Sequence, residues 1–365
     1  MIGEGMREAG SPSSDSRFGW IAVLCCSAVA LALAFMGIAQ LDLPIVRYVR
    51  SVTIHLPWDQ LTIPWMAFTS NAGDWIGRGS HLVAASLLLL AVGWLVSRPI
   101  LWKAGLESLI AHGITALVVN GLKHLIGRPR PKFMHSGDWQ FTPSLTSGLD
   151  SFPSGHAAAT FAVATVLARR FPAFGPIVLG VALFVALSRV LRGSHFPTDV
   201  VGGAILGALS GSLASAPITQ WRHSLQRALV ETAVGTCSLL ALLWTLSYPR
   251  EEGIAALLLI WLGVTTIVAG LWLRRAAWIG KKEGLRERFA QVAPALVAYG
   301  LAAMTTSPLV LASVGFACMG AWFNKPMETP PGGGTYLVVK EAMWLAGLLV
   351  ALLLLAEGRA VLPFR

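Results

Sequence analysis

The sequence has few charged residues and few cysteines for its length. Asp, Glu, Lys and Arg make up 13% of its 365 residues, whereas 55% are hydrophobic. A soluble domain carries about 25% charged residues, so this composition excludes an ordinary soluble protein. The cysteines all fall within apolar runs, where cysteine behaves as a small hydrophobic residue: Cys25, Cys26, Cys237 and Cys318. They predict neither a disulfide framework nor a metal site.

Apolar runs recur along the chain at about 20 residues, the length that a helix needs to cross a membrane. Ten spans are predicted, over residues 20–40, 81–97, 104–122, 156–170, 174–190, 199–217, 228–247, 253–273, 290–323 and 337–356. The run 290–323 is too long for one simple span, and TTSP at 305–308 interrupts it. A broken helix and a re-entrant hairpin are both open, and we favour the broken helix. The expected fold is an all-α integral membrane protein.

The net charge of +10 could indicate a nucleic-acid partner, but the basic residues alternate with the spans. The predicted inner loops hold Arg98, Lys103, Arg169, Arg170, Arg222, Arg227 and a cluster over 274–288. Cytoplasmic loops of membrane proteins carry such an excess of Lys and Arg. The pattern therefore predicts that both termini are cytoplasmic and argues against nucleic-acid binding. The absence of any Asn-x-Ser/Thr sequence fits a bacterial inner membrane.

Three polar segments at the outer ends of predicted spans are not explained by this charge rule. They read KHLIGRPRPK at 123–132, FPSGHAAATF at 152–161 and SRVLRGSHFPTD at 188–199. Basic side chains near helix ends often extend to lipid headgroups. Contacts of basic side chains with headgroups do not explain the Ser-Gly-His sequence, nor a His and an Asp four residues apart. Because all three segments face the same predicted side, we expect them to form one site.

The cations and helix starts in these segments suit a phosphate group. Lys123, Arg130 and Arg189 supply three positive charges, two of them planar guanidinium groups that match phosphate oxygens. Ser154 and Gly155 open a predicted helix, whose free N–H groups and dipole attract an anion.

Two histidines supply the groups that could act on this phosphate. Asp199 lies about one helical turn beyond His195. Its carboxylate can hold one ring nitrogen and leave the other free to attack. His156 is a second imidazole, suited to protonate a departing oxygen. Together the segments predict a phosphate-processing site.

The three segments resemble the motifs of the type 2 phosphatidic acid phosphatase superfamily. The family pattern is Lys, six residues, Arg-Pro; then Pro-Ser-Gly-His; then Ser-Arg, five residues, His, three residues, Asp. This sequence matches every position, at 123–131, 153–156 and 188–199. The resemblance implies a membrane enzyme with a six-helix core and an active site on the outer face.

The resemblance also implies a role for each matched residue. His195 would be the nucleophile that forms a phosphohistidine, Asp199 its orienting residue and His156 the general acid. The phosphoryl oxygens would be bound by Lys123, Arg130, Ser154, Gly155 and Arg189. The reaction would need no metal and no other cofactor.

The resemblance covers about residues 20–220 and so divides the chain. We expect a polar tail over 1–18, the six-helix core over 19–220 and an accessory domain over 221–365 with about four further spans. The accessory half carries no phosphate or nucleotide motif. The sequence leaves open whether it packs against the core, forms an oligomer or shapes a lipid entrance, and the oligomeric state is undetermined.

Other polar residues near the motifs fall outside the pattern. Headgroup contacts or snorkelling to the membrane interface are expected for Arg128, Lys132 and Arg192, and an interfacial rather than catalytic place for His55 and His81. The outer loop 41–80 alternates apolar and polar residues and is expected to lie along the interface. Asp74, within that loop, has no predicted role.

The predicted function is that of a membrane phosphatase acting at the outer face on a lipid phosphate or diphosphate. Undecaprenyl diphosphate, phosphatidylglycerophosphate, phosphatidate and lipid A phosphate are the substrates to consider, so the partners are a membrane lipid and the bilayer. A lipid phosphotransferase that passes the same phosphoryl group to a hydroxyl is the first alternative. A lipid-binding or transport protein is the second, and the intact nucleophile and orienting residue disfavour it.

Overall fold

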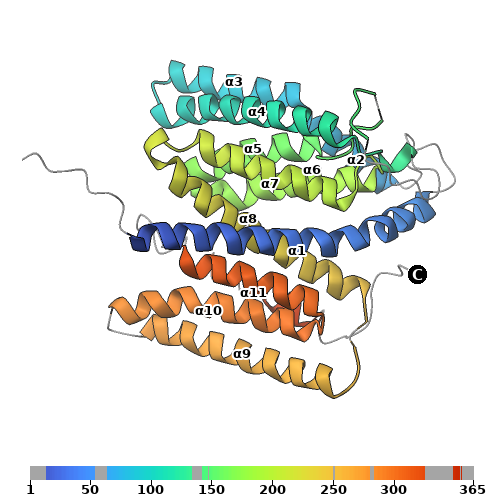
Figure 1. Ribbon diagram of the computed structural model, residues 1–365. Coiled ribbons are helices and arrows are strands. Elements are labelled where there is room, and N and C mark those ends of the chain that lie inside the picture. The colour runs from blue at the N-terminus through green and yellow to red at the C-terminus, as the bar shows by residue number, and fades with distance from the viewer. Residues whose placement is uncertain are drawn as a thin grey trace, which may run out of the picture.

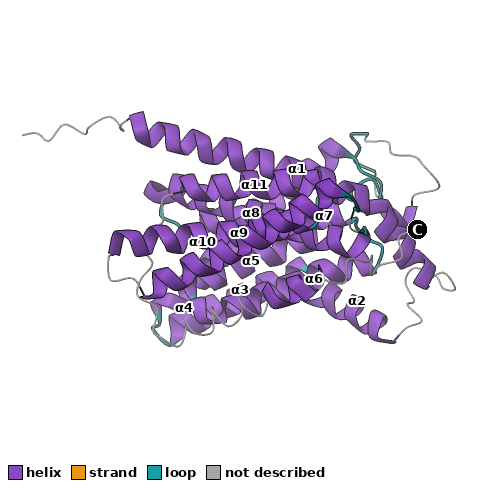
Figure 2. Ribbon diagram, turned by 90° about the horizontal axis from the view of Figure 1, so that it is seen from below, coloured by secondary structure: helices purple, strands orange, loops and turns teal. Residues whose placement is uncertain are grey.

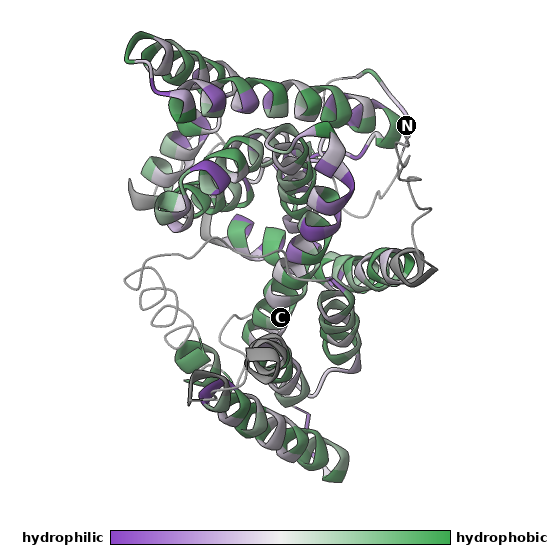
Figure 3. Ribbon diagram, turned by 90° about the vertical axis from the view of Figure 1, so that its left-hand side faces the viewer, coloured by the Kyte–Doolittle hydropathy of each residue, from purple (hydrophilic) through white to green (hydrophobic). Residues whose placement is uncertain are grey.

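Every element in the described part of the chain is a helix, and the helices run side by side as one bundle in the computed structural model (Figure 1; Figure 2). The structure describes residues 14–53, 64–133, 142–146, 148–249, 251–279, 283–324, 348–353 and 355. Hydrophobic residues cover most of the helix surfaces (Figure 3). Among the described residues, five helices are long and apolar enough to cross a membrane, and α2 with α3 makes a sixth if this pair, bent by 54°, is one span. The predicted all-α integral membrane fold is confirmed.

Counting the bent pair α2 and α3 as one, the described part of the chain has six helices before α8, and α8 to α11 with a helical stretch over 348–353 follow them. The core consists of α1 (Ser14–Thr53), the bent pair α2 (Pro64–Ile76) and α3 (Gly79–Leu95), α4 (Pro99–Ile126), α5 (Gly155–Arg170), α6 (Gly175–Leu191) and α7 (Pro197–Ala214). The further helices are α8 (Trp221–Ser247), α9 (Ile254–Ile279), α10 (Glu283–Met304) and α11 (Pro308–Phe323). Short 3-10 turns lie at Pro131–Phe133, Pro172–Phe174 and Ile218–Gln220.

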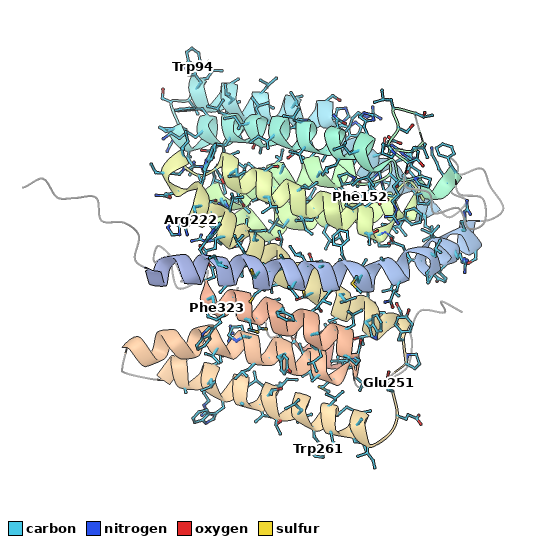
Figure 4. The ribbon with its side chains drawn as sticks, viewed as in Figure 1. Trp94, Phe152, Arg222, Glu251, Trp261 and Phe323 are labelled. Atoms are coloured by element: carbon cyan, nitrogen blue, oxygen red, sulfur yellow. The ribbon has the colours of Figure 1, made fainter. Side chains whose placement is uncertain are left out.

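The two ends of the bundle differ in charge. Phe152 and Glu251 lie at one end, and Trp94, Arg222 and Phe323 lie at the other (Figure 4). The basic residues predicted for the inner loops lie at the Arg222 end: Arg98, Lys103, Arg169, Arg170, Arg227, Arg274 and Arg275. The three motif segments lie at the Phe152 end, where α4 and α6 finish and α5 and α7 begin.

Small residues bring α5 and α7 into close contact. A Cβ added to Gly203, Gly207 or Gly211 of α7 would lie 2.3–2.5 Å from a backbone oxygen of α5 or of Ser154 before it. Such small residues, spaced four apart, let two helix backbones approach closely in a membrane. The contact sets the start of α5 beside the start of α7, and therefore the second motif segment beside the third.

The largest hydrophobic core joins the two halves of the chain through α1. Figure 1 shows α1 between the core helices and α9 to α11. Ile38 of α1 is fully buried in a cluster with Val201 of α7, Leu240 of α8 and Val310 of α11. The accessory helices therefore hold α1 from one side while α7 holds it from the other.

The prediction of an interfacial loop over 41–80 is wrong for most of its length. Residues 41–53 continue α1 with Pro44 inside it, and residues 64–76 form α2. The extension of α1 is stabilised by packing, because Leu41, Val46 and Val49 are buried along one face. The sequence pattern alone could not show this face, since the proline reads as a break.

The preferred interpretation of 290–323 as one broken helix is also wrong. Cys318 lies beside Ala295, with its Sγ 3.5 Å from the backbone oxygen, and Gly315 lies beside Tyr299, so α10 and α11 run antiparallel. The reversal occurs at the TTSP sequence, where Thr306 has a positive φ of 58° and Pro308 starts the next helix. Phe323 consequently lies at the Arg222 end (Figure 4), not at the predicted outer side. The predicted loop after it and most of the predicted last span lie outside the described residues.

Candidate active site

The first motif segment folds back beside the end of α4. Gly127 ends this helix with a φ of 60°, a left-handed conformation that favours glycine, and its N–H donates to the Lys123 carbonyl. The Arg130 N–H then donates to the Gly148 carbonyl at 3.0 Å, and the Ser151 N–H to the Arg128 carbonyl at 2.9 Å. These bonds hold both arginines against the segment that leads into α5.

The second and third segments are joined by the caps of α5 and α7. Ser154 precedes α5, and its N–H donates to the carbonyl of Asp199 at 2.9 Å. Pro197 lies in the first turn of α7, where a missing N–H costs nothing. The Asp199 carboxylate accepts the Phe196 N–H at 2.8 Å, which closes the cap. Two helix starts therefore meet at one point.

His195 is buried in the turn between α6 and α7, with one ring nitrogen engaged. Its Nδ1 lies 2.8 Å from the Ser151 carbonyl oxygen and 3.7 Å from Asp199 Oδ2. A carbonyl can only accept, so Nδ1 carries the proton and Nε2 is left with its lone pair. Burial lowers the pKa of His195 below its ordinary value, although Asp199 opposes the shift. The Ser151 carbonyl thus contacts Nδ1 of His195 directly, and the Asp199 carboxylate lies slightly farther from the same nitrogen.

Asp199 is fully buried and accepts hydrogen bonds through both carboxylate oxygens. Ser151 Oγ donates to Oδ2 at 2.6 Å, and Arg128 Nη1 donates to Oδ1 at 2.6 Å. With the Phe196 N–H, these donors satisfy a carboxylate that water does not reach. The negative charge beside His195 is therefore fixed in place.

Arg128 lies between two buried carboxylates, and the prediction of headgroup contacts or snorkelling for it is wrong. Its Nη2 donates to Asp42 of α1 at 2.8 Å while Nη1 reaches Asp199. The guanidinium also stacks 4.1 Å from the centre of the Phe196 ring. Arg128 is only 4% exposed and Asp42 is not exposed at all. The positive charge of this buried arginine is therefore matched by two carboxylates, as a buried charge requires.

Lys123 and Arg130 share one carboxylate, that of Asp150. Arg130 donates to Asp150 through Nε at 2.8 Å and Nη2 at 2.6 Å, a two-point contact, and Lys123 Nζ lies 3.7 Å away. Burial alone would raise the pKa of the Asp150 carboxyl, but Arg130 and Lys123 hold it below its ordinary value. Two predicted phosphate-binding cations therefore face an ionised carboxylate.

Arg189 and His156 likewise share Asp74 of α2. Arg189 Nη1 donates to Asp74 Oδ1 at 2.7 Å, and His156 Nε2 lies 3.4 Å from the same oxygen. Gly73 and Gly77 allow this approach, since a Cβ at either would lie within 2.6 Å of α6 side chains. Asp74 is therefore part of the cluster.

Two hydrogen-bond donors of the cluster have no partner among the described residues. Ser154 Oγ and Arg189 Nε are both buried and make no hydrogen bond there. Such groups are rare in folded proteins and mark sites that a ligand can complete. Gly155, next to Ser154, lies close to Lys123, because a Cβ built on it would be 3.8 Å from Nζ.

All eight residues that the sequence predicts for the site lie in this one cluster. His195 is close enough to Arg130, Arg189, Asp199 and His156 for their charges to affect it, and Lys123 stands in the same relation to His156 and Asp199. Their individual roles stay predictions. Sequence reasoning missed Asp42, Asp150 and Ser151 and gave Asp74 no role. Only Asp42 left a signal, as an acid inside what proves to be a membrane helix.

The remaining polar residues lie at the margin of the cluster or away from it. Arg192 Nη1 is 3.6 Å from Asp74, and the Lys132 ammonium is 4.9 Å from the Phe133 ring. His81 contacts the Trp75 carbonyl at 2.7 Å. His55 lies outside the described residues. In the described ranges, no group of three or more His, Cys, Asp or Glu is placed to hold a metal ion.

The chain is similar to known proteins over the region that holds this cluster. Residues 104–222 match the model of the PAP2 superfamily. Lipid A 1-phosphatase of Rhizobium johnstonii is 38% identical over 40% of this chain and 58% of its own length. Phosphatidylglycerophosphatase B of Bacillus subtilis is 33% identical over 40% of this chain and 72% of its own length. A Bacillus subtilis transmembrane PAP2-type phosphatidylglycerolphosphate phosphatase, known from its crystal structure, is 24% identical over 52% of this chain and 93% of that chain, with a TM-score of 0.37.

The fold and the site define an integral membrane protein of bundled helices with a cluster of cations and two histidines at one end. The aligned region spans little more than half the length of the Rhizobium relative, but it covers over two thirds of the Bacillus phosphatidylglycerophosphatase. The chain belongs to the PAP2 superfamily.

Proposed function

We propose that this protein is a membrane phosphatase that removes the phosphate or diphosphate headgroup of a lipid. The reaction runs through a phosphohistidine on His195 and uses only side chains of this chain. The support is the convergence of a buried imidazole with a free Nε2, three cations from two segments, and two donors that have no partner in the described residues, Ser154 Oγ and Arg189 Nε.

In the first step, His195 Nε2 attacks the phosphorus of the substrate. The new N–P bond forms as the bond from phosphorus to the leaving oxygen breaks, and protonated His156 gives its proton to that oxygen. Lys123, Arg130 and Arg189 hold the phosphoryl oxygens, and their fixed charges stabilise the negative charge of the transition state.

In the second step, a water molecule attacks the phosphorus of the phosphohistidine. His156, now neutral, takes a proton from that water, and the N–P bond breaks to release inorganic phosphate and neutral His195. Because His156 ends the cycle protonated, the site returns to its starting state.

The bundle suggests how a lipid reaches this site. The cluster lies at the mouths of α4 to α7, so an acyl or isoprenyl tail can stay in the bilayer while its headgroup enters. The basic residues in the connections at the opposite end support a cytoplasmic position for that end. We therefore place the site at the outer face of a bacterial inner membrane. The named relatives act on lipid A, phosphatidylglycerophosphate and similar lipids, which sets the substrates to test first.

Phosphate release from a panel of lipid phosphates and diphosphates tests the proposal. Purified protein in detergent is expected to release phosphate from at least one of these lipids, with the same rate in EDTA. Loss of activity in EDTA that added metal restores would contradict the metal-free mechanism. Release of no phosphate, together with a trapped phosphohistidine, would instead identify a phosphotransferase and prompt a search for its hydroxyl acceptor.

Asp74 occupies Arg189 Nη1, a donor that a bound phosphate could otherwise use, so Asp74→Asn is expected to tighten the binding of phosphate mimics. A site occupied by its own carboxylate binds ligand with an affinity reduced by the fraction of molecules that are free. We expect orthovanadate to inhibit Asp74→Asn at about a tenfold lower concentration than wild type. Arg78→Gln is the matched control, because Arg78 contacts Asp74 from the exposed side at 3.3 Å. Equal or weaker inhibition of Asp74→Asn would show that the carboxylate does not compete.

A further inference from the structure

A buried network ties α1 to the catalytic cluster through residues that lie outside the family pattern. Asp42 of α1 accepts Arg128 Nη2 at 2.8 Å and the Thr198 N–H at 3.0 Å, and it also accepts the Thr198 hydroxyl. The Arg128 guanidinium and the Thr198 N–H can only donate, so Asp42 accepts through both of its oxygens, and we take it to be a carboxylate. Thr198 Oγ1 in turn accepts from Arg128 Nη1 at 2.7 Å.

Arg128 is consequently shared between two carboxylates that compete for its charge. Its Nη1 lies 2.6 Å from Asp199 Oδ1, so the contact to Asp199 is as close as the contact to Asp42. Asp42, Arg128 and Asp199 together carry one net negative charge, and all three side chains are at most 5% exposed. Charges interact strongly across such a water-free region.

This net negative charge affects the proposed reaction because the His195 imidazole becomes positively charged during it. His195 keeps its proton on Nδ1, held by the Ser151 carbonyl, while Nε2 forms a bond to phosphorus. The ring therefore becomes positively charged in the transition state. A single buried negative charge behind the ring stabilises that positive charge, whereas a neutral network would not.

We propose that Asp42, acting through Arg128, is a positioning residue that sets the negative charge which Asp199 presents to His195. This inference rests on the proposed function of His195 as the nucleophile. Asp42 itself contacts neither the imidazole nor the phosphate-binding cations. Its effect is transmitted by the arginine that it shares with Asp199.

The position of Asp42 is fixed by packing on both sides of α1. Asp42 lies one turn beyond Ile38, which is buried against α7, α8 and α11. Leu41 beside it is fully buried as well. The accessory helices thus have a structural link to the nucleophile through α1, which packs against both halves of the chain.

The proposal predicts opposite changes in the pH profile for two substitutions. Asp42→Asn leaves Arg128 paired with Asp199 alone, so Asp199 supports the imidazolium less and the pKa of His195 falls. The acidic limb of kcat/KM should then move to lower pH. Arg128→Gln removes the shared cation, so the limb should move to higher pH.

The charged and titratable groups that face the His195–Asp199 pair are Lys123 of α4, Arg128 and Arg130 of the segment after it, His156 of α5 and Arg189 of α6. None of these other than Arg128 is bonded to Asp42 in the described residues. A shift produced by Asp42→Asn therefore reports on Arg128 and Asp199.

Steady-state kinetics of lipid phosphate hydrolysis across pH, with the full-length protein in detergent, tests the proposal. Asp42→Asn is expected to lower kcat on the order of tenfold without changing KM, because Asp42 does not contact substrate. Asp42→Glu keeps the charge and should restore most of kcat and the wild-type limb. Thr198→Val is the matched control, since it removes hydrogen bonds from the same network but no charge, and should leave the limb in place.

Each outcome decides the matter. A shift of the limb in Asp42→Asn but not in Thr198→Val supports the proposal, and an opposite shift in Arg128→Gln supports it further. An active wild type with no shift in Asp42→Asn, or the same shift in Thr198→Val, overturns it and leaves Asp42 a structural residue. A wild type that neither releases phosphate nor forms a phosphohistidine overturns the proposed function instead. If Arg128→Gln does not fold, the pH profiles of the two Asp42 variants and of Thr198→Val still test the proposed role of Asp42.

Discussion

Replacing His195 with alanine is expected to abolish phosphate release. The substitution removes the ring nitrogen that is proposed to attack phosphorus, while the cations proposed to bind the phosphoryl group remain. Loss of a nucleophile of this kind lowers the rate by roughly four orders of magnitude or more. The measurement is the initial rate on the best lipid of the panel, together with trapping of labelled phosphoprotein by an alkaline workup, because a phosphohistidine is stable in base and labile in acid.

The matched control for this prediction is His81→Ala. His81 is also a histidine near the Phe152 end, but its ring contacts Trp75, through the carbonyl oxygen and the indole ring, and not the motif residues. We expect this variant to keep the wild-type rate. Wild-type turnover by His195→Ala would disprove the phosphohistidine mechanism, because no other group in the described cluster is held in the same way.

His195→Ala should still bind phosphate mimics, which separates binding from chemistry. Ser154 Oγ, Arg189 and Arg130 do not depend on His195 for their positions, since their hydrogen bonds run to other partners or to none. A variant that neither turns over substrate nor binds vanadate would indicate a collapsed site. Thermal unfolding with and without vanadate distinguishes these cases.

The parts of this site that the sequence predicts are the parts that begin or end helices. Pro153 to His156 and Phe196 to Asp199 each combine a proline with a polar cap, and the structure starts α5 at Gly155 and α7 at Pro197. Helix starts are local features, so their residues can be read from a few neighbours. The glycines of α7 then bring the two starts together, which explains why residues 40 apart in the sequence meet.

The carboxylates of Asp42 and Asp74 were not predictable in this way, because each meets its partner from a distant element. Asp42 reaches Arg128 from 86 residues away, and Asp74 reaches Arg189 from 115 residues away. Nothing in the sequence near either acid indicates its partner. The sequence did supply the cations, whose positions run against the charge rule for membrane proteins, and buried cations require anions. A search for unassigned acids at the same end of the bundle would have been the way to find them.

The reversal at TTSP escaped prediction for a different reason. A run of 34 residues suits one bent span or two short helices, and the apolar composition of both halves is the same. The decision depends on Thr306 adopting a positive φ, which a threonine rarely does. The Glu251 N–H donates to Thr306 Oγ1 at 3.1 Å, a contact from the α8–α9 connection that helps to hold the turn. Contacts of this kind appear only in the folded chain.

Asp199→Asn is expected to lower kcat by about three to four orders of magnitude. The amide is neutral, so the network behind His195 loses the net negative charge that stabilises the imidazolium of the transition state. The substitution also replaces one acceptor oxygen with an NH2 donor. If the NH2 group points away from Arg128, it faces the Phe196 N–H and the Ser151 hydroxyl, which are donors to this position in the wild type. One of these bonds is then lost, or the His195 ring changes its tautomer and presents the wrong nitrogen.

The same change should cost stability, because it disturbs a buried hydrogen-bonded group. We expect the free energy of unfolding to fall by about 1–3 kcal/mol, with the protein still folded, since Arg128 keeps Asp42 as a partner. Ser151→Ala is the matched control for the kinetic effect. It removes the Oγ bond to Asp199 at 2.6 Å but keeps both the charge and the backbone carbonyl that holds His195.

The comparison of these two variants separates charge from geometry. If charge dominates, Ser151→Ala retains most of kcat while Asp199→Asn loses it, and the burst of phosphohistidine in a single turnover slows in Asp199→Asn alone. If both variants lose the same activity, the hydrogen bonds around Asp199 matter more than its charge. In that case Asp42, which acts on the same charge from one residue further away, should have little effect on the pH profile. The two experiments therefore test one electrostatic arrangement from opposite sides of Arg128.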